Sequence, residues 1–246
     1  MELIRAFQTN KLIRKLNTEM MEIGIIGSGN IGSTLAGYLT ALGHQVLISN
    51  SRGPESLGEI ADKTGATAVT TEVAAGAKDL IIIAIPNKAI VNLPKEILSA
   101  SKAIIIDAGN YYPSRDGHIA DIEGGLTDSE WVSKVIGHPV IKAFNNIVAP
   151  SLASKAVPPG SANRIALSVA GDDQQQKQAV IRLIDQIGFD AIDGGALSES
   201  WRQQPGTPAY CQDLDKDTLK SALQKADITK RDESRSQADE MARPYL

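Results

Sequence analysis

Gly27-Ser28-Gly29-Asn30-Ile31-Gly32 is the stretch that decides the fold, because it joins the apolar run 23–26 directly to a helical pattern. Glycines at this spacing let the backbone turn sharply from strand to helix, approach a pyrophosphate closely and pack the helix on the strand. The free N–H groups of the helix then point at the phosphates. The stretch therefore predicts a dinucleotide-binding turn, and an ordinary glycine-rich turn is the alternative.

The residues that follow complete a strand–turn–helix–strand unit. Apolar residues at helical spacing continue to Leu39, Gly43 ends the pattern, and the run 45–48 is typical of a second parallel strand. Helical patterns separate most later apolar runs; one begins at a capping box of Thr127 and Glu130, and another ends at Gly188. The further runs expected in the same parallel sheet are 68–69, 80–85, 103–106, 139–143, 165–169 and 191–192. We therefore predict an α/β, Rossmann-type doubly wound, mainly parallel sheet with a small C-terminal helical lobe.

The end of the second strand indicates which dinucleotide binds. An NAD site usually has an Asp or Glu about 20 residues after the glycines, where it accepts the ribose hydroxyls and repels a 2′-phosphate. Here the stretch reads Ser49-Asn50-Ser51-Arg52, without a carboxylate. Hydroxyl groups and a guanidinium suit a phosphate, so NADP(H) is favoured over NAD. The alternative for Arg52 is an ordinary exposed charge.

Composition narrows the classes of function. The formal charge of −4, with scattered basic residues, argues against nucleic acid and against anionic membrane surfaces as partners. No apolar run has the length of a membrane span. Cys211 is the only cysteine, which excludes an intramolecular disulfide and fits a cytoplasmic location. A nucleophilic role for its thiol is not favoured, because no base lies beside it in sequence.

Three parts follow from this pattern: an N-terminal extension over 1–20, an NADP-binding Rossmann domain over 21–195, and a small C-terminal lobe over 196–246. The extension is either an accessory helix or an addition to the native protein that results from an upstream start codon, and it lacks the apolar core of a secretory signal. From 217 onward the composition is polar and charged, with a short apolar stripe of Leu219, Ala222 and Leu223. This predicts a surface helix that leads into a flexible tail.

The cofactor groove is expected outside the carboxyl ends of the strands, where open parallel sheets bind their ligands. The residues expected at the cofactor are the glycine turn and residues at the strand ends: Gly27, Ser28, Gly29, Asn30, Ile31, Gly32, Ser49, Asn50, Ser51, Arg52, Ile85, Pro86, Lys88, Asn110, Ala143 and Asn145.

Acid–base residues are sparse, and no catalytic residue can be assigned. The three histidines have no ligand-like spacing and no metal or serine-hydrolase motif occurs, so we expect no metal. Hydride transfer between two heterocycles needs little side-chain chemistry. Lys88, Tyr112 and Lys142 are candidate proton donors if the acceptor is a small carbonyl or imine, and the alternative for each is a polar residue at the rim of the groove.

Five motifs in order resemble the family of deazaflavin-dependent NADP reductases, and the related reductase domain of the STEAP metalloreductases is similar too. The motifs lie at 23–32, 49–54, 140–145, 169–173 and 188–195, and the resemblance covers about 22–210. It implies hydride transfer between NADPH and a flavin-like second cofactor, in a protein that is often dimeric.

The resemblance also implies roles for individual residues. Ser28, Asn30 and Ile31 would meet the pyrophosphate, Ser51 and Arg52 the 2′-phosphate, and Pro86 the nicotinamide side. Asn145 lies where deazaflavin reductases tend to have a histidine, and its Lys-Ala-Phe-Asn run is closer to the STEAP-type pattern.

A further segment, 198–210, suggests a place for the second ligand. Its Trp201, Arg202 and Tyr210 could hold an anionic planar molecule between aromatic faces and a cation, with core packing as the alternative for Trp201.

The sequence thus predicts a cytoplasmic, homodimeric NADPH-dependent oxidoreductase that acts on a deazaflavin, FMN, FAD or another small acceptor. The alternatives are a regulatory module that senses NADPH without turnover and a small carbonyl or imine reductase.

Overall fold

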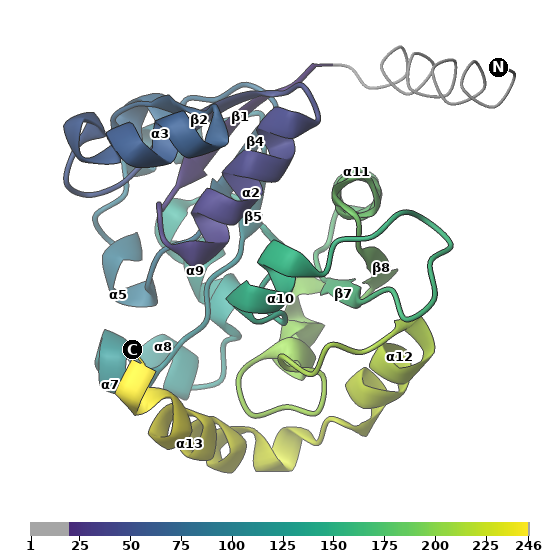
Figure 1. Cartoon of the computed structure of the whole chain (residues 1–246). Coiled ribbons are helices and arrows are strands. Elements are labelled where there is room, and N and C mark those ends of the chain that lie inside the picture. The colour runs from purple at the N-terminus through teal and green to yellow at the C-terminus, as the bar shows by residue number, and fades with distance from the viewer. Residues whose placement is uncertain (1–19, 246) are drawn as a thin grey trace, which may run out of the picture.

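The computed structural model describes residues 20–245 and centres on a six-stranded, wholly parallel sheet (Figure 1). Its strands are β1 (Glu22–Ile26), β2 (Gln45–Ser49), β3 (Thr67–Ala68), β4 (Leu80–Ile83), β5 (Ile104–Asp107) and β6 (Ile141–Lys142), in the spatial order β3-β2-β1-β4-β5-β6. The order reverses direction between β1 and β4, which creates a crevice at their carboxyl ends. The predicted doubly wound α/β fold is confirmed.

Helices cover both faces of this sheet. Along β4 the side chains alternate: Leu80 and Ile82 belong to one apolar cluster, and Ile81 and Ile83 to the other. The first cluster packs under α2 (Asn30–Ala41), α10 (Ala149–Ser154) and α11 (Gln174–Ile187). The second packs under α4 (Thr71–Ala75), α5 (Asn87–Ile90), α6 (Lys95–Ser99), α8 (Ala120–Glu123) and α9 (Asp128–Ile136). This burial on both faces explains why the strands read as continuous apolar runs.

Shorter elements connect these layers. They are η1 (Pro54–Leu57), α3 (Gly58–Thr64) and α7 (Pro113–Asp116). The predicted helix ends are confirmed: the Thr127 and Glu130 capping box begins α9, and Gly188 ends α11.

The last two strands differ from the sequence prediction, because they form a separate two-stranded parallel sheet. β7 (Ala166–Val169) pairs only with β8 (Asp190–Asp193), across α11. Lys142 and Ala170 form a single antiparallel bridge between the two sheets. The main sheet ends there because the chain leaves β6 at Phe144, whose φ of 63° lies outside the extended range. The strand predicted over 80–85 also ends two residues earlier than expected, at Ile83. The two residues that follow, Ala84 and Ile85, line the cavities described below.

The C-terminal part consists of helices and a longer loop over 204–215. It contains η2 (Leu197–Gln203), α12 (Lys216–Lys225), η3 (Ile228–Lys230), α13 (Arg231–Ala242) and η4 (Arg243–Tyr245). The predicted stripe of Leu219, Ala222 and Leu223 is buried against β7. Where the composition predicts a flexible tail, the structure instead has α13, which crosses to α7 so that the chain end lies beside that helix (Figure 1). Arg235 and Asp239 of α13 are buried there, and polar residues thus provide contacts that an apolar pattern does not reveal.

The predicted N-terminal extension over 1–20 lies outside the described residues, apart from Met20. Within residues 20–245, no helix is both long and apolar enough to cross a membrane. The division at 195 and 196 stays a prediction, since the apolar core under α2 continues into β7 and α11.

Candidate cofactor and acceptor site

The turn between β1 and α2 is built by three glycines with different tasks. Gly27 has a φ of 118°, and a Cβ there would collide with the carbonyl oxygen of Ala84 on β4's extension. A Cβ at Gly32 would collide with the carbonyl oxygen of Gly27, so this glycine lets α2 pack on the turn. A Cβ at Gly29 would have no atom within 4 Å, so its backbone faces open space. Such an opening lets a ligand approach the backbone closely.

The N-terminus of α2 adds free donors to this opening. Gly29 is its N-cap residue, and neither a side-chain cap nor an acidic residue occupies the first turn. The first N–H groups of a helix lack partners within the helix, and the helix dipole favours an anion there. The turn therefore fits a pyrophosphate.

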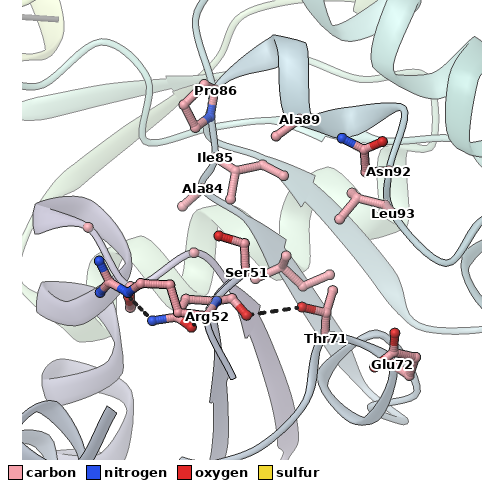
Figure 2. Close-up of a pocket in the computed structure, with 15 residues that line it drawn as sticks. Ser51, Arg52, Thr71, Glu72, Ala84, Ile85, Pro86, Ala89, Asn92 and Leu93 are labelled. Atoms are coloured by element: carbon pink, nitrogen blue, oxygen red, sulfur yellow. Dashed lines mark hydrogen bonds between the residues drawn. The ribbon is translucent and has the colours of Figure 1, made fainter. Parts of the chain in front are cut away.

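A first cavity of about 530 Å³ opens beside this turn (Figure 2). Ser51 and Arg52 line one side, and Ala84, Ile85 and Pro86 the other. The remaining lining residues are Ile26, Gly27, Ser28, Gly29, Asn50, Thr71, Glu72, Ala89, Asn92 and Leu93.

Asn50 ties the loop after β2 to the glycine turn. Its Nδ2 donates to the hydroxyls of Ser28 (3.3 Å) and Ser56 (2.9 Å), and its Oδ1 accepts from the backbone N–H of Arg52 (2.9 Å). The Arg52 side chain is exposed at the cavity. The loop thus holds the Arg52 guanidinium and the Ser51 hydroxyl beside the turn. Within the described residues neither group has a hydrogen-bond partner, and together they suit a phosphate ester.

Glu72 is a carboxylate in this cavity that sequence reasoning missed. Hydrogen bonds from its own backbone N–H and from the Thr70 hydroxyl lower the pKa of its carboxyl group, so it is ionised at neutral pH. It lies 20 residues beyond Arg52 in sequence and reaches the cavity because α4 follows β3 at the sheet edge. No motif signals it.

A second cavity of about 440 Å³ continues from the first along the same edge of the sheet. The two cavities share Ala84, Ile85 and Pro86 in their linings. The second is also lined by Ile31, Ala108, Gly109, Asn110, Tyr112, Arg115, Phe144, Asn145, Ile147, Val148, Ala149, Tyr210, Cys211, Ala242 and Tyr245. The chain therefore has one long groove in two compartments that meet at the end of β4.

An amide network holds one side of the second cavity. The Nδ2 of Asn145 donates to Oδ1 of Asn110 (3.0 Å) and to the carbonyl oxygen of Gln203 (2.8 Å), while Nε2 of Gln203 donates to Oδ1 of Asn145 (2.8 Å). Asn145 is 2% exposed, so its amide is committed to positioning the ends of β5, β6 and η2. Asn145 also lines the second cavity, and its predicted role at the cofactor stays a prediction.

Two tyrosine hydroxyls meet in the wall of the second cavity. The hydroxyl oxygens of Tyr112 and Tyr210 lie 2.6 Å apart, and Asn110 donates to Tyr210 at 3.4 Å. Burial raises the pKa of both phenols, so both remain protonated at neutral pH. Beside them, burial raises the pKa of the Cys211 thiol to about 11, which argues against a thiolate nucleophile.

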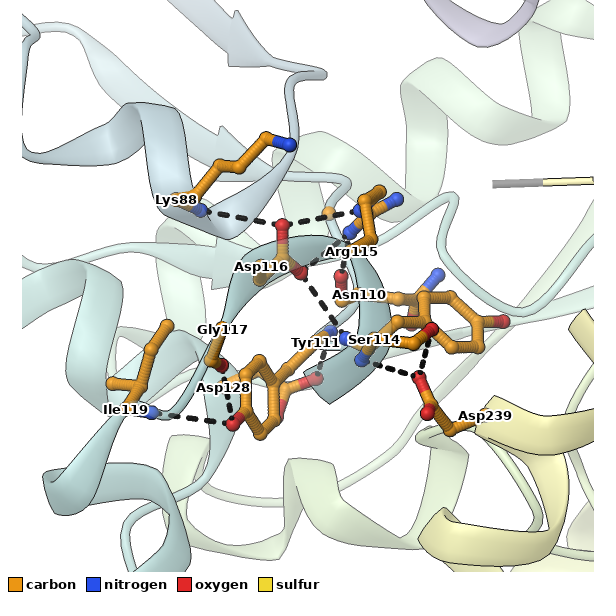
Figure 3. A network of polar contacts seen from close by, with 12 residues as sticks. Lys88, Asn110, Tyr111, Ser114, Arg115, Asp116, Gly117, Ile119, Asp128 and Asp239 are labelled. Atoms are coloured by element: carbon orange, nitrogen blue, oxygen red, sulfur yellow. Dashed lines mark hydrogen bonds and ion pairs between the residues drawn. The ribbon is translucent and has the colours of Figure 1, made fainter. Parts of the chain in front are cut away.

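Five of the predicted cofactor residues do not line either cavity: Asn30, Gly32, Ser49, Lys88 and Ala143. Gly32 packs under the turn, Ser49 donates to the carbonyl oxygen of Ile25, and Ala143 is fully buried. Lys88 has an exposed side chain, and its backbone N–H donates to Asp116 (Figure 3).

The position of Lys142 does not fit its predicted role as a candidate proton donor. Its Nζ donates to Oδ2 of Asp107 (3.1 Å) and to the carbonyl oxygen of Gly109, and the side chain is fully buried. Of the three candidate donors, the structure places only Tyr112 in a cavity.

The predicted cluster of Trp201, Arg202 and Tyr210 is not assembled. Trp201 is buried, and the Arg202 guanidinium lies 4.4 Å from its ring centre. Arg202 also donates to Glu199 and to two carbonyl oxygens at the end of α12, those of Leu223 and Ala226. Only Tyr210 reaches the second cavity, so core packing is the correct reading for Trp201. Two lining residues that no motif signals are Arg115, which stacks on Tyr112, and Tyr245 at the chain end.

A parallel sheet with a crevice at its reversal point, and a glycine turn that leads from β1 into an uncapped helix, define a Rossmann-type dinucleotide-binding protein. The chain belongs to the family described as NADP oxidoreductases, coenzyme F420-dependent, whose family model matches residues 22–111.

Three individual proteins resemble this chain in sequence or fold. A hypothetical protein, SMa0349 of Sinorhizobium meliloti, is 35% identical, with a TM-score of 0.65 over 78% of this chain and 93% of that one. A candidate F420-dependent NADP reductase of Arthrobacter sp. FB24 shares the fold at 22% identity, with a TM-score of 0.61 over 73% of this chain and 87% of that one. The protein YjhV of Escherichia coli K12 is 43% identical over 67 residues, which are 27% of this chain and 49% of YjhV. The match thus spans about half the length of that curated relative.

Proposed function

We propose that this protein is an NADPH-dependent oxidoreductase that transfers hydride between NADP(H) and an acceptor in the second cavity. The observation that carries the proposal is the junction of the two cavities at Ala84, Ile85 and Pro86. A dinucleotide whose adenosine half lies in the first cavity beside Arg52, and whose pyrophosphate lies at the glycine turn, would bring its nicotinamide half to this junction. An acceptor in the second cavity then meets it there, and such proximity is the main contribution of a protein to hydride transfer.

The extra phosphate of NADP(H) would be held by Ser51 and Arg52 in the loop after β2. Both side chains line the first cavity, and Asn50 fixes the loop against Ser28. Ser28, Gly29 and the first N–H groups of α2 would hold the pyrophosphate. Ile85 and Pro86 would lie beside the nicotinamide, because they belong to both cavities.

A planar acceptor of the deazaflavin or flavin class fits the second cavity best. Apolar side chains of Ile31, Ile147 and Val148 and the phenol rings of Tyr112 and Tyr210 line it. Such surfaces bind flat aromatic rings by stacking and apolar contact. In the reaction, hydride carries two electrons from NADPH, which leaves as NADP⁺, and the acceptor gains that hydride and a proton from water. The family description and that of the Arthrobacter neighbour support a deazaflavin.

A second candidate is a small carbonyl or imine reductase, which the Tyr112 hydroxyl favours. This hydroxyl lies at the wall of the acceptor cavity and is hydrogen-bonded to Tyr210, so it could donate a proton to an oxygen or nitrogen that receives hydride. Tyr112→Phe separates the two candidates. It would lower kcat about 100-fold or more for a carbonyl or imine acceptor, and by less than about threefold for a flavin.

The test is an acceptor screen with the full chain. NADPH is mixed with oxidised coenzyme F420, FMN, FAD or simple carbonyl and imine compounds, and loss of nicotinamide absorbance is followed. We expect oxidation with a deazaflavin or flavin. NADPH binding without oxidation by any acceptor would contradict the enzyme proposal and favour the sensor. The resemblance also predicts a homodimer, which light scattering after gel filtration tests, and a cytoplasmic location.

A further inference from the structure

The C-terminal helix α13 docks on two of the segments that line the acceptor cavity. The first loop, over 109–116 and including the short helix α7, contributes Asn110, Tyr112 and Arg115 to the lining. The Oδ1 of Asp239 accepts hydrogen bonds from the backbone N–H (3.0 Å) and the hydroxyl (2.8 Å) of Ser114 in this loop (Figure 3). Asp239 is 7% exposed, so this contact is an interior one.

Arg235 makes the second contact with the first loop. Its guanidinium lies 5.6 Å from the ring centre of Tyr111, and the residue is 7% exposed. Tyr111 in turn donates its backbone N–H to the buried carboxylate of Asp128 (Figure 3). A buried cation on an aromatic face, near a buried carboxylate, is a specific attachment that an ordinary surface helix would not need.

The other loop, over 206–211, contributes Tyr210 and Cys211 to the same cavity. Its Gly206 has a φ of 87°, and a Cβ there would collide with the carbonyl oxygen of Ser234 on α13. The backbones of the loop and the helix therefore approach each other as closely as only a glycine allows. Docking of α13 is thus coupled to both loops.

The last described residues also reach this cavity. Ala242, the last residue of α13, and Tyr245 of η4 both line the second cavity, and Tyr245 remains 89% exposed. A side chain that lines a cavity and is open to solvent stands at its mouth.

We propose that the segment 231–245 is the outer wall of the acceptor cavity, and that Tyr245 covers the acceptor and contributes to its selection. The identity of the acceptor rests on the proposed function. The assignment of 231–245 as a cavity wall does not, because it follows from the docking contacts of α13. The acceptor would be a planar molecule, since Tyr245 adds a third phenol ring to those of Tyr112 and Tyr210 around one cavity.

Cys211 provides a test that needs no acceptor, because it is the only cysteine and it lines this cavity. The rate at which N-ethylmaleimide labels the native protein measures access to the cavity. We expect Tyr245→Ala and Arg235→Ala to be labelled about three to ten times faster than the wild type, because one opens the mouth and the other loosens the docking. Tyr245→Phe and Met241→Ala should stay within about twofold, since Met241 is 71% exposed on the same helix and is absent from the lining.

Unchanged labelling in Tyr245→Ala would overturn the proposal, as would equally fast labelling in Met241→Ala. A second measurement uses FMN as the probe, titrated by its fluorescence with NADP⁺ present. Tyr245→Ala should weaken FMN binding about three- to tenfold, and Tyr245→Phe should restore it. NADPH affinity should stay within about twofold in both variants, because Tyr245 does not line the first cavity. Failure of FMN to bind any form, with the labelling result intact, would contradict the flavin acceptor and not the wall.

Discussion

The ammonium group of Lys142 lies 3.1 Å from the Asp107 carboxylate, and the two side chains are 0% and 2% exposed. They belong to the neighbouring strands β5 and β6, where Asp107 pairs in register with Lys142. The Ser129 hydroxyl and the backbone N–H of Gly109 also donate to the carboxylate. The pair therefore joins the two strands beside Gly109, which lines the acceptor cavity.

Lys142→Met should destabilise the protein by about 3 kcal/mol or more, because it leaves Asp107 buried without its counter-charge. The free energy of unfolding from urea titration measures this. Lys88→Met is the matched control, and it should change stability by less than about 0.5 kcal/mol because that side chain is exposed. A stable Lys142→Met protein that has lost turnover would instead restore Lys142 as a proton donor.

Replacing either of two glycines of the turn by alanine should have different effects on stability. Gly32→Ala should cost about 1–3 kcal/mol of stability, because its Cβ collides with the backbone of Gly27. Gly29→Ala should fold with a stability within about 0.5 kcal/mol of the wild type, since its Cβ meets nothing and its φ is −71°.

The cost of Gly29→Ala should appear in cofactor binding. A methyl group at this opening stands where the pyrophosphate would approach the backbone, so NADPH affinity should fall about tenfold or more. Isothermal titration calorimetry measures the NADPH affinity of Gly29→Ala, and thermal unfolding compares the stability of Gly29→Ala and Gly32→Ala with that of the wild type. Wild-type affinity in Gly29→Ala would mean that the turn does not bind the cofactor.

Arg52→Ala should weaken NADPH binding about tenfold and leave NADH binding within about twofold, because only NADPH carries the 2′-phosphate that the guanidinium would bind. Dissociation constants for both nucleotides measure the difference. Arg182→Ala, which removes an exposed arginine of α11 away from both cavities, is the control. Equal losses for NADPH and NADH would indicate that Arg52 only shapes the loop. A wild-type protein that prefers NADH would instead point to Glu72 as the ribose ligand.

The reactivity of Cys211 should depend on pH in a way that reflects its burial. Its folded pKa of about 11 lies above the value of roughly 8.5 expected for an unfolded chain, so the thiolate forms only at higher pH. The alkylation rate with iodoacetamide should therefore still rise about tenfold per pH unit between pH 8.5 and 9.5 in the native protein. In urea, the rate should level off over the same interval. A native profile that levels off near pH 8.5 would contradict the burial of this thiol at the cavity.

The raised pKa also has a consequence for stability. At a pH between the unfolded and the folded pKa, the unfolded chain has released the thiol proton and the native protein still binds it. Unfolding is then favoured by proton release, so this group makes the protein less stable as pH rises from about 9 to about 11. Urea titrations of the wild type and of Cys211→Ser at pH 7.5 and 9.5 measure this contribution of the thiol. From pH 7.5 to pH 9.5 the wild type should lose more stability than the variant.

Much of the fold could be predicted from local patterns. The glycines of the β1–α2 turn, the capping box at Thr127 and the apolar runs of the six main strands act within a few residues of their own position, so their effect can be read along the chain. The candidate site could be predicted in part for the same reason. Strand ends of a parallel sheet meet at one edge, and this placed Arg52, Pro86 and Asn110 in one groove.

The sequence by itself thus determined the parallel sheet, the glycine turn and the basic loop after β2, because each follows from local backbone geometry and hydrophobic periodicity. Only the tertiary structure decided that Tyr112 meets Tyr210, 98 residues later, and that Lys142 is buried against Asp107. It also decided that α13 returns to the acceptor cavity through Arg235 and Asp239. These contacts depend on which polar side chains face each other after the chain has packed, and the periodicity of a single segment carries no information about a partner so far away in sequence.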